Sequence, residues 1–180
     1  MTRHSEFVVQ VSGLTRAVGT RRHEVRSGRI PGLEGIGAKV PPQAEIVVDV
    51  ILEAVIGGVS VTGTVKAPWA GECRRCLSPA GGVLELAVRE LYTPGGDCDE
   101  TYPLFDDVVD LELMAHDAVL LDLPVAPLCR ESCAGLCPRC GEDLNQGPCG
   151  CVVERDPRFA ALDVLRSPGE PPAHPSSGPV

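Results

Sequence analysis

Several features that mark large classes of proteins are missing from this chain of 180 residues. Its first residues are polar, and no apolar run is long enough for an export signal or a membrane span. It has no glycine-rich phosphate loop, no G-x-S-x-G elbow and no ordered Ser/His/Asp set. Aromatic residues make up only 3% of the chain. These absences predict a cytoplasmic protein that is not an enzyme and that binds neither a membrane nor a small-molecule substrate.

Basic residues are also scarce, and they are unevenly placed. The net charge is −9, which counts against nucleic acid because phosphate contacts need Lys and Arg. Residues 1–40, however, hold seven basic and three acidic groups, whereas residues 97–122 hold nine acids and no Lys or Arg. This asymmetry predicts one face for an anionic partner and another that repels it or meets a basic protein. The alternative is a solvated surface with uneven charge.

Hydrophobic residues make up 43% of the chain, enough for a core, and their spacing predicts an α+β fold. Period-two alternation predicts strands at 45–56 and 59–65, joined across Gly57 and Gly58, and a further strand at 81–92. Shorter strands are expected at 7–11 and around 23–25. We therefore expect a mostly antiparallel β-sheet.

One main helix is predicted over residues 110–121, capped by Asp110. Its buried face is expected to hold four residues and a fifth near its end, namely Leu111, Met114, Ala115, Ala118 and Leu121. Asp156 followed by Pro157 predicts a second, short helix. The expected domains are a β-rich domain at 1–127, a cysteine-rich metal-binding module packed on it at 128–166, and a disordered tail at 167–180.

Nine cysteines are the most informative residues, and six of them fall between positions 129 and 151. That segment is rich in Gly and Pro and has too few apolar side chains to form a core. In a reducing cytosol, clustered cysteines are metal ligands more often than disulfides. The sequence therefore predicts a module held in shape by a metal.

The predicted ligands are four cysteines, Cys137, Cys140, Cys149 and Cys151. Two residues separate the first two thiols, and Gly141 can adopt the positive φ of a metal-binding turn. The i, i+2 spacing of the other two suits one centre in an extended chain. Zinc is the expected metal for four thiolates, with iron as the rival.

Alternative ligands remain open. Cys133, and then Cys129, could replace a member of the second pair. Cys73 and Cys76 form a further pair upstream, so that eight cysteines could fill two four-thiolate sites and leave Cys98 over. The simpler interpretation is one site in the C-terminal cluster, with the upstream pair as core or turn residues of the sheet.

The order of these motifs resembles the bacterial YceD-like family, the large ribosomal RNA subunit accumulation proteins. The resemblance spans roughly residues 5–165 and rests on C-R-R-C-L at 73–77 and G-L-C-P-R-C-G-E-D-L-N at 135–145. It implies a non-enzymatic factor in ribosome assembly that is needed for accumulation of large-subunit ribosomal RNA. Some members of this family keep the CxxC of the sheet and lack the C-terminal cluster, which favours a self-contained metal site in that cluster.

The leading hypothesis is thus an assembly factor that contacts ribosomal RNA, the pre-ribosomal large subunit or a ribosomal protein. Its predicted contact residues are basic, namely Arg21, Arg22, Arg26, Arg74 and Arg75. Two alternatives come from other classes. One is a thiol or metal-responsive switch, and the other is a zinc-ribbon module that binds proteins through the acidic face at 97–122.

Overall fold

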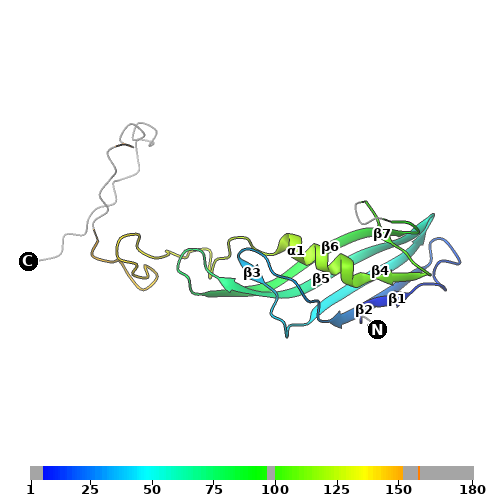
Figure 1. Cartoon of the computed structure of the whole chain (residues 1–180), viewed down its shortest axis with the longest axis horizontal. Helices are drawn as coiled ribbons and strands as arrows, with labels where there is room; N and C mark the ends of the chain where they lie inside the picture. Colours follow the sequence, from blue (N-terminus) through cyan, green and yellow to red (C-terminus); the bar gives the residue numbers. More distant parts are fainter. Residues whose placement is uncertain (1–5, 97–99, 152–157, 159–180) are drawn as a thin grey trace, which may run out of the picture. The chain divides into compact units, whose positions relative to one another are not determined.

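A computed structural model describes residues 6–96, 100–151 and 158 of the chain. The chain divides into two compact units, 1–133 and 134–180. Among the described residues, all named strands and the helix lie in the first unit (Figure 1). The predicted helix that begins at Asp156 and the predicted tail at 167–180 fall outside the described residues, apart from Arg158, and so does Cys98.

The main sheet is built from long antiparallel strands. Its order is β2, β4, β5, β6, β7, with β3 paired to the far end of β5. The strands are β2 (Arg21–Gly28), β3 (Ala38–Lys39), β4 (Ile46–Val55), β5 (Gly58–Glu72), β6 (Pro79–Thr93) and β7 (Tyr102–Pro103). Only the short β6–β7 pair is parallel. A second sheet joins β1 (Val8–Gln10) to β8 (Val108–Asp110). The predicted fold class, a mostly antiparallel sheet with one helix, is confirmed.

Strand β4 shows why this sequence forms a sheet with one buried face. Every second residue of the strand is buried, as the period-two pattern predicts. Alternating residues of β5 face the same core. The core-facing residues are Ile46, Val48, Val50, Leu52 and Ala54 on β4, and Val59, Val61, Val65 and Ala67 on β5. Aliphatic side chains therefore form the greater part of this core.

The β4–β5 hairpin has its turn one residue earlier than the sequence predicts. Val55 pairs with Gly58, so the two-residue loop is Ile56-Gly57. Gly57 takes the positive φ of 87° that the turn requires. Gly58 instead lies inside β5, where a Cβ atom would collide with the carbonyl oxygen of Tyr92 on β6. The two glycines thus have different roles, one in the turn and one in close strand packing.

Helix α1 (Leu111–Asp122) begins where the sequence predicts. The Asp110 side chain accepts a hydrogen bond from the backbone N–H of Glu112 at 2.9 Å, which caps the first turn. Leu111, Met114 and Ala115 are buried, as predicted.

The last turn of α1 corrects the predicted buried face. Leu121 is 87% exposed, and Val119 is fully buried in its place. Successive residues of an α-helix are rotated by about 100° around its axis. Val119 and Leu121 therefore lie on opposite sides of the helix face that Leu111 and Ala115 define. The core lies on the Val119 flank, which leaves Leu121 in solvent.

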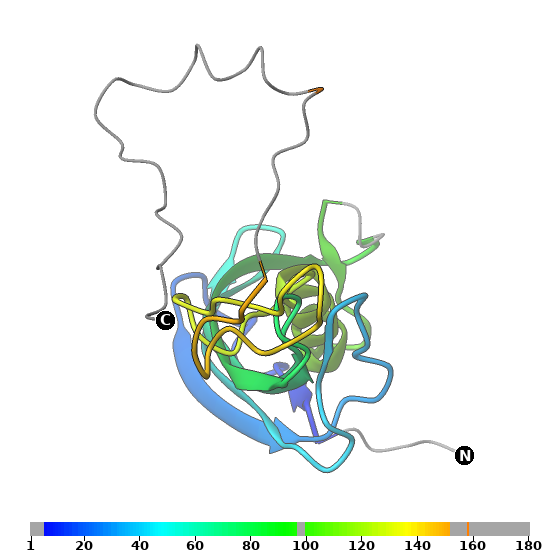
Figure 2. The same ribbon diagram turned by 90° about the vertical axis from the view of Figure 1, so that its left-hand side faces the viewer.

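Figure 2 shows the main sheet as an arch with α1 on its concave side. The helix contacts β5, β6 and β1, so it covers the buried face of the sheet. Among the described residues, no helix has the length and apolar character needed to span a bilayer.

The cap of α1 gives a first testable prediction. Asp110→Ala should lower the free energy of unfolding by about 1 kcal/mol, because a backbone N–H at the start of the helix loses its acceptor. Asp110→Asn should change it little, since Asn caps equally well. Urea denaturation followed by circular dichroism measures both. Equal losses in the two variants would contradict a capping role.

Candidate metal centres

The first thiolate group begins in the loop that joins β5 to β6. Strand β5 ends at Glu72 and β6 begins at Pro79, which leaves a tight connection that holds Cys73 and Cys76. The backbone N–H of Leu77 donates to the carbonyl of Cys73 at 2.8 Å, and that of Cys73 donates to the carbonyl of Ser78 at 2.8 Å. This turn aims both thiols to one side.

Leu77 adopts a conformation that glycine usually supplies. Its φ is 61°, in the left-handed region. Gly141 has the matching place after the second cysteine of the other CxxC pair, with a φ of 76°. Both residues donate their backbone N–H to the carbonyl of the first cysteine, at 2.8 and 2.9 Å. The two CxxC segments therefore form the same kind of metal-binding turn.

The segment after α1 completes the first group. The backbone N–H of Arg74 donates to the carbonyl of Pro127 at 2.9 Å, which holds this segment against the turn. Cys129 Sγ then lies 3.6 Å from Cys76 Sγ, and Cys133 Sγ lies 3.7 Å from Cys73 Sγ. All four sulfurs lie within 4.8 Å of one another.

These distances suit a tetrahedral ion. Four sulfurs at about 2.3 Å from one Zn²⁺ stand about 3.8 Å apart. The observed separations of 3.6 and 3.7 Å are near that value and far longer than a disulfide bond. Four protein ligands also close the coordination sphere, which is typical of a structural site and leaves no position for substrate.

Arg75 fixes the second half of this group. Its guanidinium Nη1 donates to the carbonyls of Cys133, at 2.9 Å, and Glu131, at 3.3 Å. The side chain thus bridges the β5–β6 loop and the segment that carries Cys133. Of the four thiols, those of Cys73, Cys76 and Cys133 are buried and that of Cys129 belongs to an exposed residue.

The surroundings favour a thiolate at Cys73. Burial raises the pKa of this thiol, but backbone hydrogen bonds from Cys129, Cys76 and Arg75 outweigh burial and lower the pKa to about 6. At Cys129 the effect is opposite, because burial and the adjacent thiols, first that of Cys133, raise its pKa to about 12. Four adjacent thiolates repel one another, and a divalent cation removes that repulsion.

The second group lies entirely within the second unit. The sulfurs of Cys137, Cys140, Cys149 and Cys151 also lie within 4.8 Å of one another. Backbone hydrogen bonds from Cys140 and Arg139 lower the pKa of Cys137 to about 6. The Cys140 thiol and burial raise the pKa of Cys151 to about 12. Each group therefore contains a thiol whose pKa is lowered, Cys73 or Cys137, and a thiol whose pKa is raised, Cys129 or Cys151.

Polar side chains hold the loop between the two halves of the second group. The Asn145 side-chain oxygen accepts from the backbone N–H of Ala134 at 2.9 Å, while the Asn145 backbone N–H donates to Asp143 Oδ1 at 3.0 Å. The backbone N–H of Leu144 donates to the carbonyl of Gly135 at 2.9 Å. The residues E-D-L-N after the CxxC turn thus shape the loop by hydrogen bonds in place of a core.

The structure brings together the four thiols that the sequence analysis placed first, Cys137, Cys140, Cys149 and Cys151. It places the alternative ligands Cys129 and Cys133 elsewhere, with Cys73 and Cys76. The simpler interpretation, a single site, therefore gives way to two groups that could each hold a metal ion. Leu77 in place of the usual glycine concealed the first turn in the sequence.

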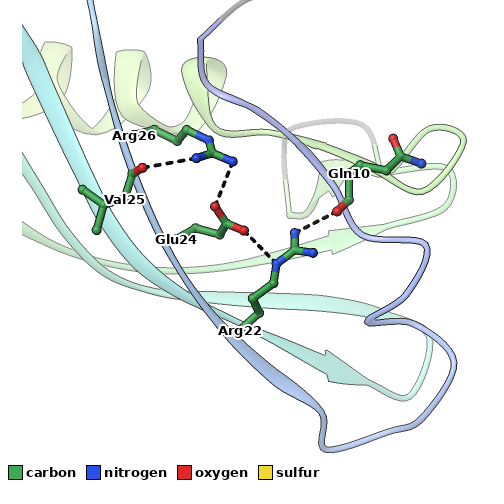
Figure 3. A network of polar contacts seen from close by, with 5 residues as sticks. All are labelled: Gln10, Arg22, Glu24, Val25 and Arg26. Atoms are coloured by element: carbon green, nitrogen blue, oxygen red, sulfur yellow. Dashed lines mark hydrogen bonds and ion pairs between the residues drawn. The ribbon is translucent and has the colours of Figure 1, made fainter.

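Three of the predicted RNA-contact residues are engaged on β2. Arg22 Nε lies 2.7 Å from Glu24, and Arg26 Nη2 lies 2.8 Å from the other oxygen of the same carboxylate (Figure 3). Arg22 also donates to the carbonyl of Gln10 at 2.8 Å. Arg21 pairs with Glu53 on β4 at 3.0 Å. These ion pairs compensate part of the basic charge of β2.

The other two predicted arginines lie in the first CxxC turn. Both are exposed, and Arg75 also donates to backbone carbonyls of the segment that carries Cys133. Arg74 lines an open cleft of about 630 Å³ between residues 34–39 and 70–77, together with Glu34, Lys39 and Glu72. The role of all five arginines in binding RNA or a partner stays a prediction.

Comparison with protein families finds one match. The family model described as large ribosomal RNA subunit accumulation protein YceD matches residues 61–166. The matched range contains α1 and the cysteines of both thiolate groups. It also contains Arg74 and Arg75, while the three arginines of β2 lie before it.

Relatives in other organisms extend this similarity over most of the chain. An uncharacterised protein of Mycobacterium tuberculosis is 40% identical over 174 residues, which cover 91% of this chain and 83% of the relative. One from Mycobacterium leprae is 33% identical and covers 83% of this chain and 73% of its own length. The chloroplastic large ribosomal RNA subunit accumulation protein YCED homolog 1 of Arabidopsis thaliana is 32% identical over 59 residues, 32% of this chain and 18% of that protein. No solved structure matches the chain.

Two thiolate groups should give two bound ions per chain. The purified protein should carry about two equivalents of Zn²⁺ by plasma mass spectrometry, one per four thiolates. Replacing Cys73 and Cys76 by Ser should leave one equivalent and lower the melting temperature of the sheet. Replacing Cys149 and Cys151 should also leave one, with the melting temperature of the sheet little changed.

Cys98→Ser serves as the matched control for these cysteine variants and should keep both ions. Two equivalents retained without Cys73 and Cys76 would contradict a metal site in the first group.

The conformation of Leu77 leads to a further prediction. Leu77→Gly should raise the free energy of unfolding by about 1 kcal/mol, because a left-handed conformation costs a non-glycine residue about that much. Leu77→Val should lower it, since a β-branched side chain fits this conformation less well. Chemical denaturation of the zinc-loaded protein measures both. The opposite order would show that Leu77 is not strained.

Proposed function

Because this chain belongs to the YceD family of large ribosomal RNA subunit accumulation proteins, we propose that it is a non-enzymatic factor in assembly of the large ribosomal subunit. In this role it supports the accumulation or processing of large-subunit ribosomal RNA in the cytoplasm. The observation that carries the proposal is the family match, whose range includes both four-thiolate groups.

The metal in both groups is proposed to be zinc, with a structural role. Thiolate-only ligands at tetrahedral spacing favour Zn²⁺ among the available divalent ions. A site closed by four protein ligands supplies no open position for a substrate or an activated water. The thiolate groups therefore support a binding protein more than a metalloenzyme.

Contact with ribosomal RNA is proposed to involve Arg74. Its side chain is exposed, whereas the charge of the β2 arginines is partly compensated by Glu24 and Glu53. Arg74 also belongs to a turn that backbone hydrogen bonds and the first thiolate group hold rigid. An arginine on a rigid turn loses little conformational freedom when it binds phosphate, which favours it as a contact residue.

A sedimentation experiment tests this proposal. The tagged full-length protein should co-sediment with immature large-subunit particles at low salt and move to the light fractions as salt rises. Arg74→Glu should weaken this association and reduce the salt slope by roughly one, the value for one lost phosphate contact. Depletion of the protein should lower the ratio of large- to small-subunit ribosomal RNA.

Arg16→Glu is the matched control, because Arg16 is also an exposed arginine and lies outside the CxxC turns and the set of predicted contact residues. It should leave co-sedimentation unchanged. If the wild-type protein stays wholly in the light fractions at low salt, and its depletion leaves the RNA ratio unchanged, the assembly role is wrong.

A further inference from the structure

Strand β6 forms a long, unpaired edge of the main sheet. It pairs with β5 along nearly its whole length, from Pro79 to Tyr92. On its other side it meets only β7, at Tyr92 and Thr93. Among the described residues, positions 79–91 therefore have no strand beside them on that side. Backbone N–H and C=O groups along such an edge are available to an added strand.

Exposure of the side chains confirms that β6 is open to solvent. Leu84 and Leu86 face the core beside Ala67 and Val65 of β5, which are fully buried. The two leucines are only half-buried, although they point to the same face. The apolar surface of β6 is thus only partly covered, whereas that of the neighbouring strand β5 is fully covered.

Helix α1 adds further apolar surface next to the edge. The Tyr102 hydroxyl on β7 donates to Asp117 Oδ2 at 3.1 Å, so the Asp117 flank of the helix faces β7 and the β6 side of the sheet. Residues three and four positions away share that flank. Of these, Met114 turns into the core, and the other three are exposed leucines, by 38% for Leu113, 39% for Leu120 and 87% for Leu121.

The net negative charge of β6 and α1 indicates the chemical class of the partner. Strand β6 and helix α1 together carry five acidic residues, Glu85, Glu90, Glu112, Asp117 and Asp122, against one basic residue, Arg89. Lys66 of β5 compensates part of this charge, because it pairs with Glu85 at 3.0 Å. RNA would be repelled here. A second copy of the chain would place one acidic edge against another, which is also unfavourable.

We propose that the unpaired edge of β6 and the leucine flank of α1 form a binding site for an extended, basic protein segment. The segment adds a strand beside β6, where its backbone pairs with residues 79–91, and its apolar side chains cover Leu84, Leu86 and the three leucines of the helix. Its lysines or arginines meet the acidic residues. This site lies outside the CxxC turn that carries the proposed RNA contact at Arg74, and it does not depend on that contact.

Hydrogen exchange followed by NMR tests the site. The probe is a fluorescein-labelled nonapeptide of alternating lysine and valine, titrated to about 1 mM with the full-length protein. Every second amide of β6, those that do not donate to β5, should exchange at least about tenfold more slowly with the peptide bound. The edge of β2 is the internal control, because it pairs only with β4 among the described strands and carries several arginines.

Two matched changes separate strand addition from simple charge attraction. The same peptide with alternate backbone amides N-methylated on its pairing side keeps its charge but loses donors, and should bind at least about tenfold more weakly. Leu121→Ala should weaken binding of the unmodified peptide about tenfold through lost apolar burial. Ile56→Ala removes an equally exposed side chain, 91% exposed in the β4–β5 turn, and should have no effect.

Any of several results would overturn the proposal. These are no binding by 1 mM, equal protection of β2 and β6, equal affinity of the N-methylated peptide, or an unchanged affinity of Leu121→Ala. If the chain dimerises with rising concentration and this protects the β6 amides without peptide, the occupant is a second copy of the chain. That result would overturn the proposal of a basic segment. Loss of RNA association in Arg74→Glu with peptide binding intact would show that the two sites are separate.

Discussion

The closure of the β5–β6 loop onto the segment after α1 is the constraint on which the first unit depends. Cys73 and Cys133 are 60 residues apart in the sequence, and Cys76 and Cys129 are 53 apart. Closing a loop of that length costs about 4 kcal/mol of chain entropy. Hydrogen bonds from Arg74 and Arg75 to backbone carbonyls, and from the Cys129 backbone to the Cys73 thiol, offset part of that cost. Four thiolates on one metal ion would supply further stability.

The two thiolate groups share the same kind of CxxC turn but join different parts of the chain. Each starts from a CxxC turn whose next residue has positive φ, Leu77 in one and Gly141 in the other. The second group then takes its partner thiols from the same short segment, so a metal ion bound there would organise a loop that has little core. The first takes them from beyond β6 and α1 and ties distant elements together. The same chemistry thus stabilises local structure in one unit and long-range structure in the other.

How far the sequence predicts this structure depends on how local each signal is. The alternation in β4 and the Asp110 cap involve near neighbours, and both were predicted correctly. Which cysteines belong to which group depends on the distant segments that the fold brings together. The spacing of the cysteines in the sequence does not encode this. Leu77 carries no glycine signal, since the fold imposes its conformation. Exposure of Leu121 follows from where β6 and β1 meet the helix, a tertiary fact that helical periodicity cannot supply.

The two edges of the main sheet differ in a way that net charge conceals. On β2, Glu24 lies between Arg22 and Arg26, so neighbouring side chains already balance part of the charge of this edge. On β6, acidic residues and exposed leucines accompany unpaired backbone, with one arginine among them. Charged side chains on the core-facing side of β2 discourage strand addition there, because an added strand would have to bury apolar side chains beside them. On β6, Glu85 pairs with Lys66, but the neighbouring core-facing positions hold Leu84 and Leu86. We therefore expect a protein partner at that edge, while Arg74 remains available to an anionic one.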